Sequence, residues 1–321
     1  MAFLMEVSLS ISNSDMKRFI KYILVVILGV VVVDLGNRVL YTIAFTHVPQ
    51  DSEVNVLYKY QLNTQKAEIV ILGASKALYN YVPKVLKDSF NCPVYNYGME
   101  GTSIVGQYLC LIKSYELGNV KTVLLDLSNS QLQEEWIVER ISRYNNYYMF
   151  NDSVKAVVDD IMGRKSLMLY SSLYQFNSHL HDFLWLYGEK RTDIDGYVAL
   201  PYTGNEVHVP RIMDKEVFVI YPKAKEYLDK IVSLCKKHGS RLVLCVSPSL
   251  FKDSSFDKYI YDYCTQHSLE FFNMRNCQMV NIDKRLYKDL SHLNGKGAVI
   301  FTKELVAKLK SHPTDLNKSN H

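Results

Sequence analysis

The chain has 321 residues, 48% of them hydrophobic, and a formal net charge of +4 at pH 7. This length allows one large domain or two small ones. The charge lacks the strongly basic balance typical of nucleic-acid-binding proteins, so no nucleic acid is expected as a partner. The six cysteines form no CxxC pair and show no His/Cys spacing typical of a metal site, so neither a metal nor another cofactor is expected.

An unbroken apolar run near the N-terminus predicts a membrane-spanning helix. The run extends from Tyr22 to Val33 and is preceded by Lys17, Arg18 and Lys21. It reaches the roughly 20 residues that a span needs if Lys21 snorkels and Asp34 lies in the far interface. The basic residues before the run place the N-terminus in the cytoplasm and the rest of the chain outside.

Two other interpretations of this run remain open. A cleaved signal peptide would have a similar apolar core, although no convincing small-x-small cleavage site follows the run. A buried helix of a soluble protein is the third possibility. We predict a retained single-pass anchor in residues 1–45, with its short N-terminus in the cytoplasm. Residues 46–321 would then form one domain on the periplasmic side.

From residue 68 onward, short apolar strands alternate with helical patterns. Ile69–Leu72 is a buried strand by its β-branched composition, and a helix over 76–88 follows, with Pro83 as its weak point. This alternation predicts an α/β fold, a three-layer, doubly wound parallel sheet. The other strands are expected at Val94–Asn96, Thr122–Leu127, Leu242–Val246 and Leu269–Asn273. One later helix is expected to end near residue 117, and three more are expected over 224–238, 255–267 and 297–309.

The alternation is interrupted between residues 131 and 214. This stretch is rich in aromatic residues and contains no clean strand, whereas Val154–Ile161 and Ser166–Leu186 have helical patterns. We interpret it as a helical insertion. It could form a lid or wall beside a functional site, or it could simply cover one face of the sheet.

Ser75 follows the first strand at the point where functional sites of parallel sheets lie. Its hydroxyl would lie beside the free N–H groups and the positive dipole end of the next helix, which stabilise an anion. Serine is also a common helix cap, so the position alone has a purely structural interpretation.

Asp289 and His292 supply what a nucleophilic serine needs. The two residues are three positions apart, so on a turn the carboxylate can reach one ring nitrogen while the other points outward. A histidine that takes the proton of a serine, oriented by a carboxylate, activates that serine for attack. The Asp289/His292 pair is a weak motif by itself, and the combination with Ser75 makes it a stronger indication of a catalytic site.

These motifs together resemble the SGNH, or GDSL-like, hydrolase superfamily. The block after the first strand reads Gly73-Ala74-Ser75, with alanine where the family usually has aspartate, and Asp289-Leu-Ser-His292-Leu-Asn is the best-matching block. The resemblance implies an SGNH fold with flavodoxin-like strand order and covers about residues 67–130 and 218–310.

Two further blocks resemble the oxyanion-hole segments of the family. Asn96-Tyr-Gly-Met-Glu-Gly101 has the spacing of the second block. The third block, Asp126-Leu-Ser-Asn129-Ser, lacks the usual glycine and final aspartate. The resemblance implies that Ser75 is the nucleophile, His292 the general base and acid, and Asp289 its orienting partner. It also implies an oxyanion hole made of the Ser75 and Gly101 N–H groups and the Asn129 amide.

The departures from the family pattern resemble those of divergent, membrane-anchored members, including relatives of acyltransferases that decorate envelope polysaccharides. The resemblance implies an extracytoplasmic serine esterase or O-acyltransferase. Its substrate would be an acyl ester, most simply acetyl, of a carbohydrate or envelope glycan. The alternatives are a degenerate SGNH-fold module that binds a glycan or protein, and a structural membrane protein that only resembles the family. The intact Ser75, Asp289 and His292 favour the enzyme.

Overall fold

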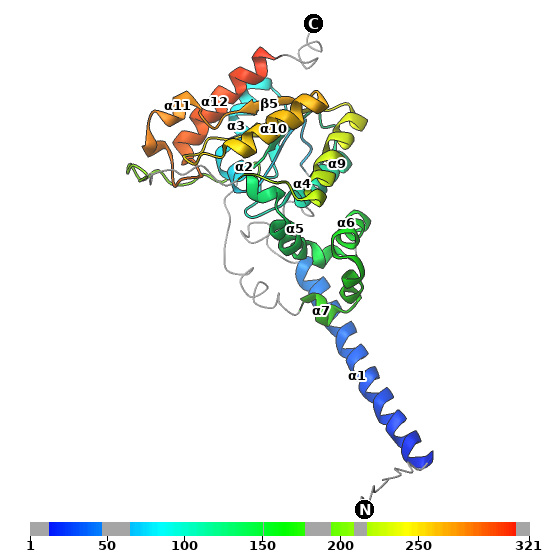
Figure 1. Cartoon of the computed structure of the whole chain (residues 1–321). Helices are drawn as coiled ribbons and strands as arrows, with labels where there is room; N and C mark the ends of the chain where they lie inside the picture. Colours follow the sequence, from blue (N-terminus) through cyan, green and yellow to red (C-terminus); the bar gives the residue numbers. More distant parts are fainter. Residues whose placement is uncertain (1–12, 47–64, 150, 177–193, 209–216, 313–321) are drawn as a thin grey trace, which may run out of the picture.

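A computed structural model describes residues 13–46, 65–149, 151–176, 194–208 and 217–312 of the chain. In this part, helices cover both faces of a central parallel sheet, and a long N-terminal helix projects away from it (Figure 1). The strands are β1 (Ile69–Leu72), β2 (Val94–Asn96), β3 (Thr122–Asp126), β4 (Arg241–Val246) and β5 (Glu270–Asn273).

The sheet has the strand order β2-β1-β3-β4-β5, and every neighbouring pair is parallel. This is the flavodoxin-like order, in which the chain reverses its winding direction after β2. Ile71 of β1 pairs with Asn96 of β2 and with Leu124 of β3. All five strands therefore end at the same edge of the sheet, and the loops that follow them meet there.

Alternate residues of the strands enter two separate hydrophobic cores. Val70 and Leu72 contribute to one core, and Ile69 and Ile71 to the other. Strands buried on both faces need apolar residues at consecutive positions, which explains their unbroken apolar runs. The first core is covered by α4 (Ile104–Leu117), α9 (Pro222–His238) and α10 (Ser254–His267); the second by α2 (Ser75–Asn80), α3 (Pro83–Phe90), α11 (Gln278–Asn281), η5 (Lys284–Leu286) and α12 (Gly295–Ser311).

The fold class expected from the sequence is confirmed, and β2 to β5 lie within one residue of their expected bounds. The helix expected over 76–88 is wrong as a single element, because two helices, α2 and α3, occupy this stretch. The chain is extended at Tyr81 and Val82 before Pro83 begins α3. Proline disfavours the helical conformation of the residue before it, and its ring fits the first position of a new helix.

The described part of the insertion is helical up to residue 176, with short helices, whereas its residues 194–208 contain no helix. The helix expected over Ser166–Leu186 is not continuous: η4 ends at Tyr170, Ser171 is extended, and a short α7 follows. The remainder of that stretch, 177–186, lies outside the described residues. The elements are η2 (Asn129–Leu132), α5 (Glu134–Arg140), η3 (Ile141–Tyr147), α6 (Asp152–Met162), η4 (Gly163–Tyr170) and α7 (Ser172–Phe176).

The insertion extends the first hydrophobic core and is tied to the rest of the fold through α6. Ile137 of α5 and Val154 of α6 are fully buried in that core. The Tyr227 hydroxyl of α9 donates to Asp160 of α6 at 2.8 Å, and the Lys223 ammonium lies 2.9 Å from the same carboxylate. The helical part of the insertion therefore covers the α9 side of the sheet, and its α5 also reaches the site described below. Tyr197, later in the insertion, packs in the second core instead.

The N-terminal helix α1 (Asn13–Thr46) is long and apolar enough to span a membrane over Ser14–Leu40, and none of that stretch is buried in the protein. Its polar positions contact the insertion. Asp34 Oδ1 accepts hydrogen bonds from the Ser171 hydroxyl at 2.7 Å and from the Leu173 N–H at 2.9 Å. Figure 1 shows α7 beside α1, between its apolar part and the domain. Asp34 thus ends the apolar run and holds the insertion.

Candidate active site

Ser75, His292 and Asp289 form a continuous chain of hydrogen bonds. The Ser75 Oγ lies 2.8 Å from His292 Nε2. The other ring nitrogen, Nδ1, lies 3.0 and 2.9 Å from the two carboxylate oxygens of Asp289. The residues come from opposite ends of the domain: Ser75 begins α2 directly after β1, and the other two lie in the loop before α12. This arrangement can transfer a proton from a serine to a histidine.

The Asp289 carboxylate is fixed by its own loop. Its Oδ1 accepts the backbone N–H groups of Ser291 at 2.7 Å and of His292 at 2.9 Å. Partial burial opposes ionisation of Asp289, but the hydrogen bonds from the His292 ring and these N–H groups outweigh it, so its pKa lies below the usual value. An ionised Asp289 favours a proton on His292 Nδ1, which leaves Nε2 free to accept the serine proton.

Ser75 does not cap helix α2. Ala74 is the N-cap residue, and no side chain makes a capping hydrogen bond there. The Ser75 hydroxyl instead lies against His292. The purely structural interpretation of Ser75 as a helix cap is therefore wrong.

Gly73 allows the sharp turn that presents Ser75. Its φ is +153°, and an added Cβ would lie 2.6 Å from the Ala77 Cβ and 2.9 Å from the Asp126 carbonyl oxygen. Backbone atoms cannot move aside as a flexible side chain can, so only glycine fits between β3 and α2. The close approach of the strand and the helix sets the position of Ser75.

Two neighbours hold the His292 side of the site. The Tyr79 ring meets the His292 ring edge to face, with centroids 5.5 Å apart, and the Tyr79 hydroxyl hydrogen-bonds the Glu100 carboxylate. Behind His292, the Leu293 N–H donates to Asn80 Oδ1 at 3.0 Å. The buried Asn80 lies on α2, the helix that also carries Ser75, so the two halves of the site are joined through one short helix.

A buried carboxylate, Asp126, lies beneath the site at the end of β3. Its Oδ1 accepts the Tyr81 hydroxyl and the Ser247 N–H, each at 2.9 Å, and its Oδ2 accepts the Ser247 hydroxyl at 3.2 Å. Burial raises the pKa of Asp126 to about 6, against the opposing attraction of the Lys76 ammonium and these hydrogen bonds. Lys76 therefore balances an internal charge.

Asp126→Asn should remove a pH-dependent loss of stability. Between pH 3.8 and about 6 the folded state holds a proton that the unfolded state has lost, so raising the pH lowers the free energy of unfolding. The difference in pKa corresponds to about 3 kcal/mol. Asparagine can still accept from Tyr81 and Ser247, so the variant should gain up to that amount over the wild type between pH 4 and pH 8.

The measurement is denaturant unfolding of both chains at a series of pH values. Asp283→Asn is the matched control, because hydrogen bonds from Arg285 lower the pKa of this half-exposed carboxylate. Its stability relative to the wild type should fall, not rise, as the pH increases through the acidic range. If the difference in free energy of unfolding between Asp126→Asn and the wild type does not change with pH, this account of the buried carboxylate is contradicted.

The Ser75–His292 pair opens into a cleft of about 160 Å³ at the carboxyl edge of the sheet. Most of its lining is polar, with one aromatic side chain from the insertion, Trp136 of α5. The insertion therefore forms part of a wall of the site as well as covering the sheet. The cleft is lined by Ala74, Ser75, Lys76, Ser128, Asn129, Ser130, Trp136, Ser249, Phe251, Asp253, Arg275, Ser291 and His292.

Asn129 lies in this cleft with Ser75, as expected for an oxyanion donor. Its side chain has two partners: Nδ2 donates to Asp253 at 3.3 Å, and Oδ1 accepts from Gln133 Nε2 at 2.8 Å. One of the two amide hydrogens is used by the Asp253 contact, and no residue in the described part of the chain accepts the other. The loss of the usual glycine and final aspartate from the third block therefore does not remove Asn129 from the cleft.

Gly101 is not among the residues that line this cleft. It has a φ of +59°, and an added Cβ would lie 3.2 Å from the Arg143 guanidinium. The same arginine donates to the Glu100 carbonyl oxygen at 2.5 Å. The structure thus brings together Ser75, Asn129, His292 and Asp289 but leaves Gly101 beside Arg143, outside the cleft lining.

Several residues of the cleft were not predicted from the sequence. Phe251 and Asp253 follow the end of β4, and Arg275 follows the end of β5, so their position after strands was a usable signal. Arg275 forms two hydrogen bonds to Asp257, at 2.7 and 2.6 Å, and donates to the Phe251 carbonyl oxygen at 3.2 Å. It fixes the β4 loop in place. No sequence pattern indicated Trp136.

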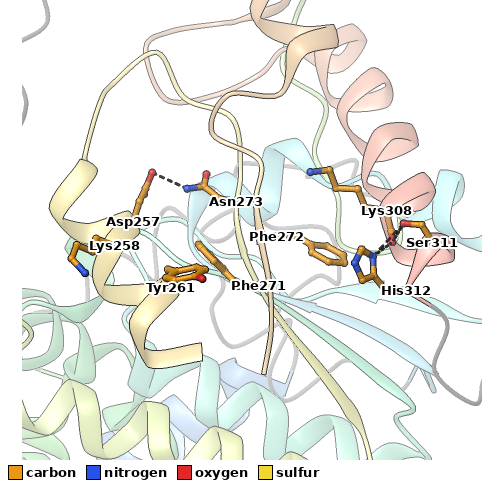
Figure 2. A pocket seen from close by; sticks show the side chains of 9 residues that line it. All are labelled: Asp257, Lys258, Tyr261, Phe271, Phe272, Asn273, Lys308, Ser311 and His312. Atoms are coloured by element: carbon orange, nitrogen blue, oxygen red, sulfur yellow. Dashed lines mark hydrogen bonds between the residues drawn. The ribbon is translucent and has the colours of Figure 1, made fainter. Parts of the chain in front are cut away.

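A larger hollow, about 840 Å³, lies away from this site at the β5 edge (Figure 2). It contains a second serine–histidine pair, in which Ser311 Oγ and His312 Nδ1 are 3.2 Å apart. No carboxylate among the described residues pairs with the His312 ring, and both side chains are exposed at the end of α12. This pair serves as an internal control for the chemistry expected of Ser75. Within the described ranges, no group of three His, Cys, Asp or Glu side chains is arranged to hold a metal.

Comparisons with known proteins give weak structural similarities. No family model matches the chain, and no curated protein matches it. A protein from Bacteroides fragilis NCTC 9343 described as a candidate acylhydrolase is 11% identical, with a TM-score of 0.40, 78% of this chain covered and 95% of that chain. A candidate platelet activating factor from Streptococcus pneumonia is 12% identical, with a TM-score of 0.37, covering 80% and 92%.

A third similar structure is a gut microbial diltiazem-metabolizing enzyme, 15% identical, with a TM-score of 0.29, covering 75% of this chain and 47% of that one. TM-scores below 0.5 at such low identity do not by themselves assign an activity. The features of this chain that bear on function are therefore the hydrogen-bonded Ser75, His292 and Asp289 and the cleft around them.

Proposed function

We propose that the protein is a serine esterase or O-acyltransferase that forms an acyl-enzyme on Ser75. The observation that carries this proposal is the continuous Ser75–His292–Asp289 hydrogen-bond chain at the mouth of a polar cleft. Serine acquires useful nucleophilicity only when a base takes its proton, and both the base and its orienting carboxylate lie within hydrogen-bond distance. The site needs no cofactor for this chemistry.

In the first half of the reaction, Ser75 Oγ attacks the ester carbonyl carbon while its proton passes to His292 Nε2. The carbonyl oxygen becomes an oxyanion, for which the Ser75 N–H and the Asn129 amide are the proposed donors; Gly101 stays a weaker proposal because it does not line the cleft. The bond to the leaving alcohol then breaks, and His292 returns the proton to that alcohol. Asp289 stabilises the imidazolium in between.

In the second half, a hydroxyl compound enters the place of the departed alcohol. His292 takes its proton, its oxygen attacks the acyl carbon, and the bond to Ser75 Oγ breaks as Ser75 regains a proton. Water gives a free acid, so the protein is then a hydrolase. A sugar hydroxyl gives a new ester, so it is then a transferase, and both outcomes use the same residues.

The size and lining of the cleft favour a short acyl group on a carbohydrate. A cleft of about 160 Å³ leaves little room for a long acyl chain. Hydroxyl side chains such as Ser128, Ser130 and Ser249 line it, and they can exchange hydrogen bonds with sugar hydroxyls. The Trp136 ring offers an apolar face beside them. An acetyl ester of an envelope glycan fits this combination.

The location of the domain is part of the proposal. Helix α1 is apolar enough for a membrane span, and Lys17, Arg18 and Lys21 precede its apolar part. The positive-inside rule then puts residues 46–321 outside the cytoplasm, on the periplasmic side, as an SGNH-type domain with its helical insertion. A cleaved signal peptide is the competing interpretation, and the hydrogen bonds of Asp34 to the insertion favour retention of the helix.

Hydrolysis of 4-nitrophenyl esters of increasing chain length tests this function. The full chain in detergent micelles should cleave the acetate faster than the octanoate, because the short cleft accommodates the acetyl group better. Addition of sugar alcohols should divert the acyl group to the sugar if the protein is a transferase, and should leave the yield of free acid unchanged if it is a hydrolase. Equal rates for all chain lengths would argue against an acetyl-sized site.

A catalytically inactive glycan- or protein-binding module is the alternative function. The observation that favours it is the engagement of Asn129 with Asp253 and Gln133, which leaves a single amide hydrogen for an oxyanion. A binding module would show no ester cleavage, but a glycan in the gel would slow its migration in affinity electrophoresis. Trp136→Ala would reduce that slowing.

A further inference from the structure

The segment from Ser166 to Gln175 has an inverted polarity. At every third position the side chain points inward, and three of these four buried residues are polar. Apart from the half-buried Ser171, the intervening residues are apolar or aromatic and lie on the surface. The buried positions are Ser166, Leu169, Ser172 and Gln175; the exposed ones are Leu167 (62% exposed), Met168 (53%), Tyr170 (46%), Leu173 (40%) and Tyr174 (46%), which we call the apolar patch.

The buried polar side chains are all hydrogen-bonded, so the inversion is a built feature. The Ser166 hydroxyl donates to Asp159 at 2.5 Å, and the Ser172 hydroxyl donates to the Asp34 carbonyl oxygen at 2.5 Å. Gln175 Nε2 donates to the Asn145 carbonyl oxygen at 2.5 Å. A segment surrounded by water would normally place its apolar side chains inside, and contiguous exposed apolar surface marks a contact with another apolar phase.

The apolar patch lies next to the point where the apolar part of α1 ends. Asp34 contacts Ser171 and Leu173, and Asn37 Nδ2 donates to the Ser172 hydroxyl at 3.3 Å. From Asp15 to Asp34 an α-helix rises about 28 Å, close to the roughly 30 Å thickness of a bilayer's hydrocarbon core. The patch is therefore at the depth of the membrane–water interface, on the side of the domain.

The composition around the patch also suits that interface. Tyr170 and Tyr174 are aromatic residues with a polar tip, the type that gathers at the headgroup level. Arg164 and Lys165 are exposed directly before the patch, where they can attract anionic headgroups. The continuity with α1 and this positive charge indicate a lipid surface as the occupant.

We propose that the apolar patch is a second membrane contact, inserted in the interfacial region of the leaflet that faces the domain. This inference rests on the membrane anchor of the proposed function. Because α6 joins this segment to α9 through Asp160, the contact fixes the height and tilt of the cleft above the membrane. The site would then act on substrates held close to the membrane surface.

Spin labels on the full chain test this contact in vesicles of phosphatidylethanolamine and phosphatidylglycerol. Single labels are placed at Leu167→Cys and Leu173→Cys, both exposed, with the half-buried Cys92 replaced by serine in every variant. Val30→Cys on α1 is the lipid reference, and Ile282→Cys, 85% exposed beyond α11, is the water reference. The collision rates of each label with oxygen and with a water-soluble nickel complex give its depth.

The proposal expects the labels at 167 and 173 to favour oxygen over nickel, as the label at 30 does and the label at 282 does not. Labels at 167 and 173 that match the label at 282, while the label at 30 lies in lipid, would refute the second contact and leave the anchor intact. A label at 30 that is accessible to nickel would refute the anchor, and with it the patch as a membrane contact.

Discussion

Replacing Ser75 or His292 by alanine is expected to lower the rate of ester cleavage by on the order of 10⁴-fold or more. Ser75→Ala removes the attacking oxygen, and His292→Ala removes the base that lies 2.8 Å from it. Ser75 and His292 act in the same proton transfer, so the rate of the double variant should be close to the rate of either single variant. Steady-state hydrolysis of 4-nitrophenyl acetate measures all three.

The chain offers a matched control for both substitutions. Ser311 and His312 form the second serine–histidine pair, at the end of α12 and away from the cleft (Figure 2). Ser311→Ala and His312→Ala should leave the rate within a factor of two or so, because this histidine pairs with no carboxylate among the described residues. A Ser75→Ala variant as active as these controls would remove Ser75 from the mechanism.

Asp289→Asn should lower the rate by roughly 10³- to 10⁴-fold without unfolding the loop. The asparagine carbonyl oxygen can still accept the N–H groups of Ser291 and His292, so the loop should keep its shape. Its amide, however, donates to His292 Nδ1, which moves the imidazole proton to Nε2. The nitrogen that faces Ser75 then carries a proton and cannot accept another.

Asp283→Asn is the control for this change, since Asp283 is a carboxylate of the same chain region whose partner among the described residues is its neighbour Arg285. The rate should stay at the wild-type level in Asp283→Asn and fall in Asp289→Asn, while the thermal midpoints of the two variants stay close. An Asp289→Asn variant that cleaves esters at the wild-type rate would show that His292 needs no orienting carboxylate.

Local patterns were sufficient to predict the central sheet. The strand runs such as Ile69–Leu72 are buried on both faces, so their composition alone distinguishes them from helices, and the alternation with helices indicates a parallel sheet. The sequence also indicated Ser75 by its position after the first strand, and Asp289 and His292 by their spacing and by the resemblance of their block to the SGNH family. Their mutual distances required the structure.

Long-range contacts account for what the sequence did not reveal. Trp136 reaches the cleft only because the insertion packs beside α4 and α9, and no spacing in the sequence indicates this. Asp34 had a local interpretation as the end of a span, whereas its hydrogen bonds to residues about 137 positions away give it a second role. The break before Pro83 was visible locally, but the pattern of apolar residues continued across it.

Covalent labelling with a fluorophosphonate tests the central claim most directly, because it needs no knowledge of the substrate. The full chain in detergent micelles is treated with the probe, and the modified peptide is identified by mass spectrometry. The account expects an adduct on Ser75 that is lost in Ser75→Ala and His292→Ala and is retained in Ser311→Ala and His312→Ala. A folded protein that forms no adduct on Ser75, or one that labels equally without His292, would contradict an activated nucleophile at this site.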